Sequence, residues 1–365
     1  MGIDFRNLDE GFGPRIFNQG KAYLYFGGTA YLGIPQHAGM NLLYQEGISK
    51  YGLNNGTSRH NNIQLGIYDK AEEYAADLFK AESALISSSG YLAAHLAVKC
   101  LAVESQVRYS QEVHPALWLE GSPNPLKHME ASKSNIFSFE RWGHAIIEEI
   151  NKSDIKTWLL ISNSINNLIP ELFDFNLFAQ INQDKKVYFV VDDSHGIGIL
   201  NGGMGIYNSL PKLKQIEWIV VASMAKALGI DAGLILASEK IISRLKQHEI
   251  YLGASPPSAA GLHAFIYGKE FYAIEWLKLQ KNKRAFENAG FLDENWQWIS
   301  ELPVYLYKPG GLAETLESHK VLISAFAYPD RNGSLLNRLV LSSWHEPKDI
   351  QDLIVSLNAS IKIKM

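Results

Sequence analysis

Cysteine is nearly absent from this chain of 365 residues, which contains only Cys100. Its apolar surroundings, Leu96–Leu101, favour a buried core thiol in a reducing compartment over a nucleophile. Long apolar runs are also missing, because none approaches the ~18 residues that a membrane-spanning helix needs. The first residues lack the basic-then-apolar layout of a secretory signal. We therefore expect a cytoplasmic protein without a membrane span.

A strong charge of either sign is missing too. The chain has 34 Lys and Arg against 38 Asp and Glu, a net charge of −4. This balance gives no electrostatic reason to expect a nucleic acid or an anionic membrane as partner. No set of His, Cys and carboxylate residues has a ligand spacing such as H-E-x-x-H, so we expect no metal. The length is sufficient for two domains.

Short apolar runs alternate with helical patterns over residues 46–240. The runs are nearly continuous in apolar residues, as expected of a mostly parallel sheet covered on both faces in an α/β fold. We expect strands at Ala84–Ile86, Val107–Tyr109, Trp158–Ile161, Val187–Val191, Trp218–Val221 and Leu234–Ala237. Helices are expected between them, at Gly66–Ala81, Gly90–Val103 and Arg141–Asn151.

The two ends of the chain have a different pattern. Residues 1–45 are expected to form an N-terminal arm with short extended pieces such as Ala22–Phe26. Residues 46–240 would form the large domain, and residues 241–365 a smaller C-terminal α+β domain. In the latter we expect strands at Val304–Tyr307, Val321–Ala327 and Arg338–Ser342, and helices at Glu239–His248, from about Ser258, and at Lys348–Asn358.

Polar segments follow most of the strands predicted for the large domain. In open α/β sheets, ligands bind beyond the carboxyl ends of the strands. The segments at these ends are Ser87–Tyr91, Ser110–His114, Ser162–Ser164, Asp192–His195 and Ser223–Lys226. All five are rich in side chains that form hydrogen bonds, so the pattern predicts a ligand site at this edge.

Lys226 is the most informative residue at this edge. It follows the apolar run Trp218–Ala222, where burial of an ammonium group is costly, and desolvation lowers the pKa of a lysine and suits it to amine chemistry. Asp192 ends another apolar strand and either keeps a heterocyclic nitrogen protonated or caps the following turn. His195 either serves the same site or is a satisfied turn histidine. The two strand ends together suggest a pyridoxal phosphate (PLP) enzyme.

Other candidate residues each allow two interpretations. The turn Ser89-Gly90-Tyr91 is either a phosphate cradle at a helix start or a simple N-cap. His114 either stacks on a planar ring or is structural. Arg338 either binds a carboxylate in a bidentate manner or forms an edge ion pair. The glycines at Gly196–Gly205 do not have the G-x-G-x-x-G spacing, which argues against NAD binding.

Taken in order, these motifs resemble the α-oxoamine synthase family of PLP-dependent acyltransferases, over nearly the whole chain. Asp192–Gly198 matches the family's D-D-A-H-G-x-G, and Ser223–Gly229 resembles its T-F-S-K-A-L-G. The further matches are Thr29–Ile34 with N-D-Y-L-G-L, Gly56–Arg59 with the G-S-R stretch, Ser89–Tyr91 with S-G-F/Y, Pro256-Pro257 with the P-P pair, and Arg338–Ile350 with the closing R…A-H…D-I segment.

The resemblance implies a fold-type I, aspartate aminotransferase-like fold with PLP as cofactor. Lys226 would be joined covalently to PLP and would move the proton at the substrate's Cα. The remaining implied roles are Asp192 at the pyridine nitrogen, His195 at the ring hydroxyl, His114 against the ring face, Ser223, Ser89, Gly90 and Tyr91 at the phosphate, and Arg338 at the substrate carboxylate.

The implied reaction condenses an amino acid with an acyl-CoA thioester to give an α-oxoamine, in a homodimer. An aminotransferase or another fold-type I enzyme is the alternative, followed by a PLP-fold protein without turnover. Thr29 replaces the family's asparagine, and Gly253 replaces a threonine that reaches the neighbouring subunit's phosphate. Ser162–Leu168 lacks the family's acidic residues. Because these changes line the substrate side, we predict an unusual substrate.

Overall fold

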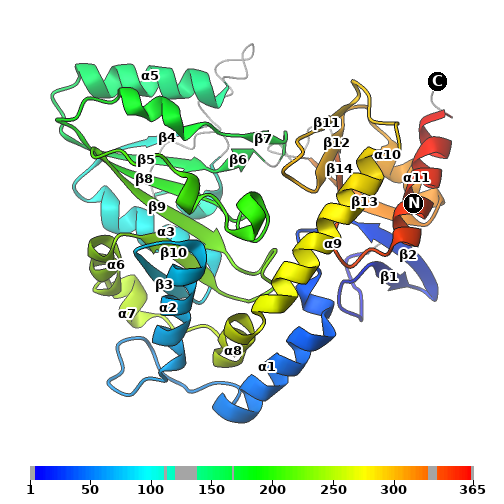
Figure 1. Ribbon diagram of the computed structural model, residues 1–365, viewed down its shortest axis with the longest axis horizontal. Coiled ribbons are helices and arrows are strands. Elements are labelled where there is room, and N and C mark those ends of the chain that lie inside the picture. The colour runs from blue at the N-terminus through cyan, green and yellow to red at the C-terminus, as the bar shows by residue number, and fades with distance from the viewer. Residues whose placement is uncertain (1–4, 111–112, 120–137, 167, 328–334, 363–365) are drawn as a thin grey trace.

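The computed structural model describes residues 5–110, 113–119, 138–166, 168–327 and 335–362, which form two sheets with helices around them (Figure 1). In the larger sheet the strand order is β3-β10-β9-β8-β5-β4. The strands are β3 (Ser83–Ser87), β10 (Gly233–Ala237), β9 (Ile216–Ser223), β8 (Lys186–Asp192), β5 (Thr157–Asn163) and β4 (Gln106–Tyr109). Strands β4, β5, β8 and β9 are parallel, and β10 is antiparallel to both of its neighbours. The mostly parallel sheet and its six predicted strands are confirmed.

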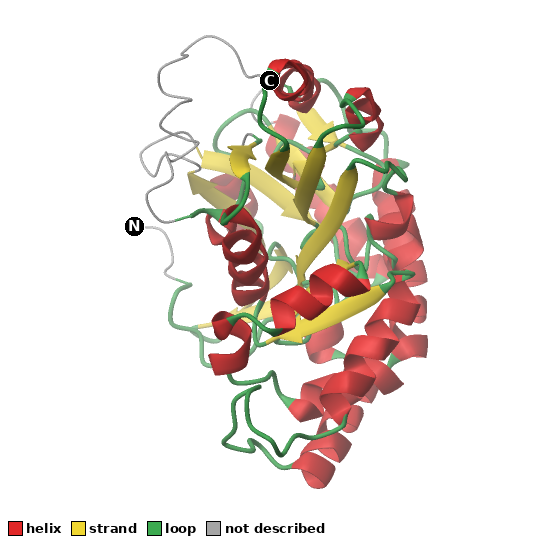
Figure 2. Ribbon diagram, turned by 90° about the vertical axis from the view of Figure 1, so that its left-hand side faces the viewer, coloured by secondary structure: helices red, strands yellow, loops and turns green. Residues whose placement is uncertain are grey.

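Both faces of the larger sheet are buried, and Figure 2 shows helices on either side of the strands. In β8, Val187, Phe189 and Val191 belong to one apolar cluster, whereas Tyr188 and Val190 belong to another. Successive side chains of a strand point to opposite faces, so burial on both sides requires an unbroken apolar run. The helices around the sheet are α2 (Ile67–Phe79), α3 (Gly90–Ala102), α5 (Phe139–Lys152), α6 (Glu239–Lys246) and α7 (Glu249–Gly253).

The smaller sheet combines strands from both ends of the chain. Its order is β1-β2-β13-β14-β12-β11, and β2 is parallel to β13. The strands are β1 (Arg15–Asn18), β2 (Lys21–Phe26), β13 (Val321–Ala327), β14 (Leu335–Val340), β12 (Val304–Tyr307) and β11 (Trp296–Trp298), with α10 (Leu312–Ser318) and α11 (Pro347–Lys362) alongside. The extended pieces of the N-terminal arm are therefore strands of this sheet. The predicted strand Arg338–Ser342 was wrong in its bounds, since β14 begins at Leu335 and ends at Val340.

Helix α1 (Ala38–Tyr51), which no predicted element covered, packs against α8 (Ala259–Tyr267). Its glycines weaken the helical pattern, but Gly47 has a packing role. A Cβ there would lie 2.6 Å from the Cα of Ala260, so only glycine permits this close approach. None of the helices in the described part of the chain is long and apolar enough to cross a membrane.

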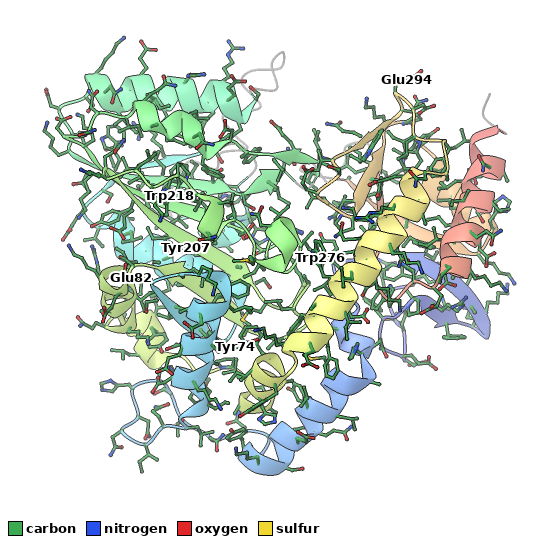
Figure 3. All side chains as sticks on the ribbon, viewed as in Figure 1. Tyr74, Glu82, Tyr207, Trp218, Trp276 and Glu294 are labelled. Atoms are coloured by element: carbon green, nitrogen blue, oxygen red, sulfur yellow. The ribbon has the colours of Figure 1, made fainter. Side chains whose placement is uncertain are left out.

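Helix α9 (Lys269–Glu287) runs between the two sheets and is tied to both. Tyr272 donates a hydrogen bond to the carbonyl of Leu228 at 2.9 Å, and Trp276 (Figure 3) donates to the carbonyl of Ile199 at 2.9 Å. Both carbonyls belong to segments that follow strands of the larger sheet. These contacts hold the carboxyl edge of that sheet against α9.

Near its C-terminal end, α9 contacts the buried segment around His345, which follows β14 of the smaller sheet. Asn282 donates to the carbonyls of Ser342 and His345 at 3.1 and 2.8 Å. The His345 ring stacks on Phe26, accepts from the Ser342 N–H at Nδ1, and therefore donates from Nε2 to the carbonyl of Tyr25 at 2.9 Å. Burial lowers the pKa of His345 to about 4.

The low pKa of His345 predicts a pH-dependent contribution to stability. Because its ordinary pKa is 6.5, the unfolded chain binds more protons between pH 4 and 6.5. The contribution of neutral His345 is therefore present above pH 6.5 and is lost as pH falls to 4. In urea unfolding, the difference in free energy between the native chain and His345→Asn should shrink by up to ~3 kcal/mol over this interval.

The difference between the two proteins is the appropriate quantity because Asp193 acts in the opposite direction. Burial raises the pKa of Asp193 to about 7, so its contribution to stability falls as pH rises toward 7. This effect is common to both proteins and cancels in the difference. A difference that stays constant from pH 4 to 7 would contradict the prediction.

Candidate active site

The carboxyl ends of the parallel strands bring the predicted site segments together. Asp192, at the end of β8, is opposite Asn163 of β5 and Val221 of β9. Gly233 of β10 pairs with Ser223 on one side and with Ser87 on the other. The segments that begin at Ser87, Asp192 and Ser223 therefore lie along one edge, as predicted.

The turn before α3 packs directly on the end of β9. Ser89 is the N-cap of α3, and its Oγ accepts a hydrogen bond from the Leu92 N–H at 3.1 Å. Gly90 is so close to Ser223 that an added Cβ would lie 2.5 Å from the Ser223 Cβ. The N-cap interpretation is confirmed. The helix start, with its partial positive charge, also stands beside Ser223, an arrangement that favours a bound phosphate. Tyr91 is 60% exposed.

Lys226 lies at one end of a chain of side-chain contacts that crosses from the larger to the smaller sheet. Its Nζ is 3.1 Å from Nε2 of His195, and Nδ1 of His195 is 2.8 Å from the hydroxyl of Tyr31. Arg338 of β14 donates from Nη2 to the same hydroxyl at 3.2 Å. The structure therefore brings together Lys226, His195 and Arg338, which the sequence predicted separately. Tyr31 was not predicted as a site residue, although it lies in the motif Thr29–Ile34.

The electrostatic environment favours the neutral forms of Lys226 and His195. Burial lowers the pKa of Lys226, and Arg338 lowers it further, whereas Asp192 acts in the opposite sense. The pKa of His195 is held well below its ordinary value by burial and by the charges of Lys226, Arg338 and His114. A lysine with a lowered pKa and a neutral imidazole are suited to proton transfer near neutral pH.

The two adjacent aspartates have different surroundings. Asp192 is partly exposed, and its Oδ1 accepts from the Ser194 N–H at 2.9 Å, so it caps the turn and still faces the site. Asp193 is buried, and its Oδ2 accepts from the Ile206 N–H at 2.8 Å. Ser194 accepts from the Ser223 N–H at 2.8 Å and so fixes the two turns relative to each other. Asp192 remains the candidate partner for a cofactor nitrogen.

His114 has both a structural contact and a place near the site. It is the N-cap of the short helix Pro115–Leu117, and its Nδ1 accepts from the Ala116 N–H at 3.2 Å. Desolvation lowers the pKa of His114, Asp192 raises it and Lys226 lowers it. These charges act on His114 because it lies near the same edge, as predicted. The structural interpretation of this histidine and its place at the site are therefore compatible.

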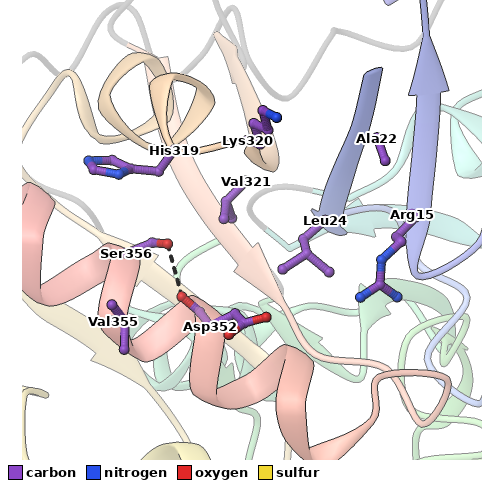
Figure 4. Close-up of a pocket in the computed structure, with 9 residues that line it drawn as sticks. All are labelled: Arg15, Ala22, Leu24, His319, Lys320, Val321, Asp352, Val355 and Ser356. Atoms are coloured by element: carbon purple, nitrogen blue, oxygen red, sulfur yellow. Dashed lines mark hydrogen bonds between the residues drawn. The ribbon is translucent and has the colours of Figure 1, made fainter. Parts of the chain in front are cut away.

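A separate cavity of about 340 Å³ lies on the smaller unit (Figure 4). Its lining includes Arg15, His319, Lys320 and Asp352. Arg15 is already paired with Asp349 at 2.6 Å. None of the predicted site residues lines this cavity.

Comparison with known proteins identifies a family and several relatives of this chain. The sequence model of the family described as aminotransferase class I and II matches residues 40–289. This chain belongs to that family. A putative 8-amino-7-oxononanoate synthase of Methanococcus vannielii is 24% identical over 363 residues, covering 94% of each chain. The 8-amino-7-oxononanoate synthase of Coprothermobacter proteolyticus is 23% identical over 98% of this chain and 93% of its own.

Solved structures share the fold at lower identity. Serine palmitoyltransferase of Sphingomonas wittichii matches with a TM-score of 0.77 and 14% identity, over 98% of this chain and 92% of its own. The 8-amino-7-oxononanoate synthase of Francisella tularensis matches with a TM-score of 0.68 and 18% identity, over 94% and 98%. The predicted fold-type I architecture is confirmed.

The aminotransferase class I and II family uses PLP, and the residues at the edge fit this cofactor. PLP needs an amine for covalent attachment, a carboxylate at its ring nitrogen and donors for its phosphate. Lys226 provides an amine whose pKa is lowered, and Asp192 a carboxylate at a neighbouring strand end. The start of α3 is in contact with Ser223 and provides backbone and hydroxyl donors.

Gly90→Ala tests whether the close contact between α3 and β9 is required. The added methyl would clash with the Cα and Cβ of Ser223, so we expect a loss of about 1–3 kcal/mol in unfolding free energy. Gly253→Ala is the matched control, because a Cβ there meets no atom within 4 Å, and it should change stability by less than ~0.5 kcal/mol. Equal effects in urea unfolding would contradict the packing described here.

Proposed function

We propose that this protein is a PLP-dependent C-acyltransferase that condenses an amino acid with an acyl-CoA thioester to give an α-oxoamine. The observation that carries the proposal is the chain of contacts from Lys226 through His195 and Tyr31 to Arg338. It supports the proposal because it joins an amine suited to proton transfer with a guanidinium suited to carboxylate binding, at the carboxyl edge of the larger sheet. The relatives named 8-amino-7-oxononanoate synthase support acyl transfer as the reaction.

Arg338 is suited to bind the carboxylate of the amino acid. It is 5% exposed, and in the described part of the chain its Nε has no hydrogen-bond partner. Buried polar groups normally have partners, and a guanidinium binds a carboxylate through two parallel hydrogen bonds. A substrate carboxylate would fill the free donor position. Arg338 would thereby orient the Cα–H bond of the substrate.

Lys226 is suited to accept the proton from that Cα. PLP, when bound, supplies the electron sink that stabilises negative charge at the Cα of an amino acid. The lowered pKa of Lys226 keeps a larger fraction of the amine neutral near pH 7 than in an ordinary lysine. Asp192 would keep the cofactor ring nitrogen protonated, and His195 would lie at the ring hydroxyl. Ser89, Gly90, Tyr91 and Ser223 would hold the phosphate, and His114 would cover the ring face.

The nitrogen groups of Arg338 and Lys226 suit the site to anionic ligands. Arg338 is permanently cationic, Lys226 is cationic only when it is protonated, and Asp192 is a nearby carboxylate. PLP, an amino acid carboxylate and an acyl-CoA all bring negative charge. We infer that the functional unit is a homodimer, because the family that the chain resembles usually builds its site across a two-fold dimer interface. The lack of the family's acidic residues in Ser162–Leu168 supports a divergent acyl or amino substrate.

Covalent attachment at Lys226 gives the first test. With PLP added, the native chain should gain a visible absorption band and a cofactor adduct that survives borohydride reduction. Lys226→Ala should lose both, because no amine remains at the site. Lys185→Ala is the control, since Lys185 is a buried lysine that donates to the carbonyl of Ile155 at 3.2 Å. A reduced adduct that persists in Lys226→Ala would overturn the assignment.

The type of reaction gives the second test. A panel of amino acids is mixed with short, long and dicarboxylic acyl-CoAs, and free CoA thiol is measured with a thiol reagent. We expect thiol release that requires both substrates and no keto acid, because C–C bond formation expels the thiolate. Arg338→Lys should lower kcat/KM for the amino acid by about 10–100-fold, since it loses bidentate binding. Amino transfer to a keto acid without thiol release would identify an aminotransferase instead.

A further inference from the structure

Tyr31 occupies a fixed position between the two sheets. It lies after β2 and before the short helix Ile34–Gln36, and 1% of its surface is exposed. Its carbonyl accepts from the N–H of Ser343 at 3.0 Å, which anchors its backbone to the smaller unit. Its hydroxyl reaches His195 at 2.8 Å and Arg338 at 3.2 Å. Among the residues that the structure describes, these are the hydrogen-bond partners of this hydroxyl.

The contacts from Arg338 through Tyr31 and His195 to Lys226 can be assigned donors and acceptors so that every donor has an acceptor. The guanidinium of Arg338 can only donate, so the Tyr31 oxygen accepts from it. The Tyr31 O–H is then free to donate to Nδ1 of His195. A neutral imidazole that accepts at Nδ1 carries its hydrogen on Nε2. That hydrogen points to Nζ of Lys226, which can accept it only as a neutral amine.

The opposite direction leaves a buried donor without a partner. If His195 carried its hydrogen on Nδ1, both His195 and Arg338 would donate to the Tyr31 oxygen. The Tyr31 O–H would then have no acceptor among the described residues. Buried hydroxyl groups without partners are rare and costly in folded proteins. The arrangement around Tyr31 therefore selects one tautomer of His195.

We propose that Tyr31 is a positioning residue that holds His195 in the Nε2-protonated tautomer and thereby keeps Lys226 as a neutral amine. The inference rests on the proposed function in one respect, that Lys226 is the amine that reacts with PLP. In that reaction the Lys226 nitrogen bonds to the aldehyde carbon of PLP, a C=N bond forms and one water leaves. The nitrogen must be neutral to attack, and neutral again to accept a proton from a substrate Cα.

Other groups around Lys226 act on the same equilibrium. Asp192 favours the ammonium form, whereas Arg338 and the desolvation of the amine oppose it. His114 lies within electrostatic range of Lys226 as well. If the Tyr31 hydroxyl were removed, His195 could carry its hydrogen on Nδ1 and accept from a protonated Lys226 at Nε2. The ammonium form would then gain a hydrogen bond.

The pH dependence of PLP capture tests this inference. The full-length protein, freed of cofactor, is mixed with PLP, and the rate of appearance of the visible band is followed from pH 6 to 10. In Tyr31→Phe we expect the midpoint of the pH profile to move upward by about one unit and the rate at pH 7 to fall about ten-fold. Tyr305→Phe is the control, because Tyr305 is also buried and its hydroxyl donates to Glu287 at 2.8 Å in the smaller unit. Its midpoint should not move.

A second variant separates an effect through His195 from one through Arg338. Removing the Tyr31 hydroxyl also frees Arg338, whose charge acts on Lys226 directly. In a His195→Gln background, Tyr31→Phe should leave the midpoint unchanged if the tautomer carries the effect. A shift of equal size in both backgrounds would overturn the proposal. So would an unchanged midpoint in Tyr31→Phe alone.

The tautomer itself can be measured in the native chain, and a variant is needed only to assign the His195 signals. Nitrogen-15 chemical shifts of the labelled histidine rings, with His195 assigned from its loss in His195→Gln, distinguish the two tautomers. We expect hydrogen on Nε2, and hydrogen on Nδ1 would overturn the proposal. If the native chain captured no PLP at all, the proposed function would fail while the tautomer assignment could still hold. The two failures are therefore distinguishable.

Discussion

The hydrogen bond between the Tyr31 hydroxyl and Nδ1 of His195 is the link on which the arrangement of the site depends. Tyr31 belongs to the segment after β2, in the smaller sheet, and His195 follows β8 of the larger sheet. Because β2 pairs with β13, and β13 with β14, the same sheet also brings Arg338 to this hydroxyl. Helix α9 forms hydrogen bonds with segments of both sheets and so fixes the position of one sheet relative to the other. The site exists only while both sheets keep this alignment.

The proximity of the Lys226 amine to the Arg338 guanidinium determines which ligands and proton transfers the site can support. Lys226 and Arg338 lie near each other in partly or fully buried positions, which is costly for two full charges. The cost is reduced because the pKa of Lys226 is lowered and because Asp192 lies close by. A bound anion would offset the charge of Arg338 further. A buried guanidinium with an unused donor is suited to binding a carboxylate, and an amine that loses its proton readily is suited to proton transfer.

Some elements could be predicted from the sequence and others could not, and the difference has physical causes. The six strands of the larger sheet were predictable because burial on both faces requires unbroken apolar runs such as Val187–Val191. Helix α1 was missed because Gly47, which permits contact with Ala260, weakens the helical pattern. The pairing of β2 with β13 has no local signal, since it joins distant parts of the chain. Tyr31 looks like a core tyrosine in sequence, and its role becomes visible only where three elements meet.

A crystal structure of the full chain with PLP bound would test the central claim most directly. The account predicts continuous electron density between Lys226 and the cofactor, the ring nitrogen within hydrogen-bond distance of Asp192, and the phosphate between the start of α3 and Ser223. Arg338 should then face the substrate side of the cofactor while it keeps its contact with Tyr31. Density for PLP attached to another lysine, or a phosphate located away from Gly90 and Ser223, would contradict the account.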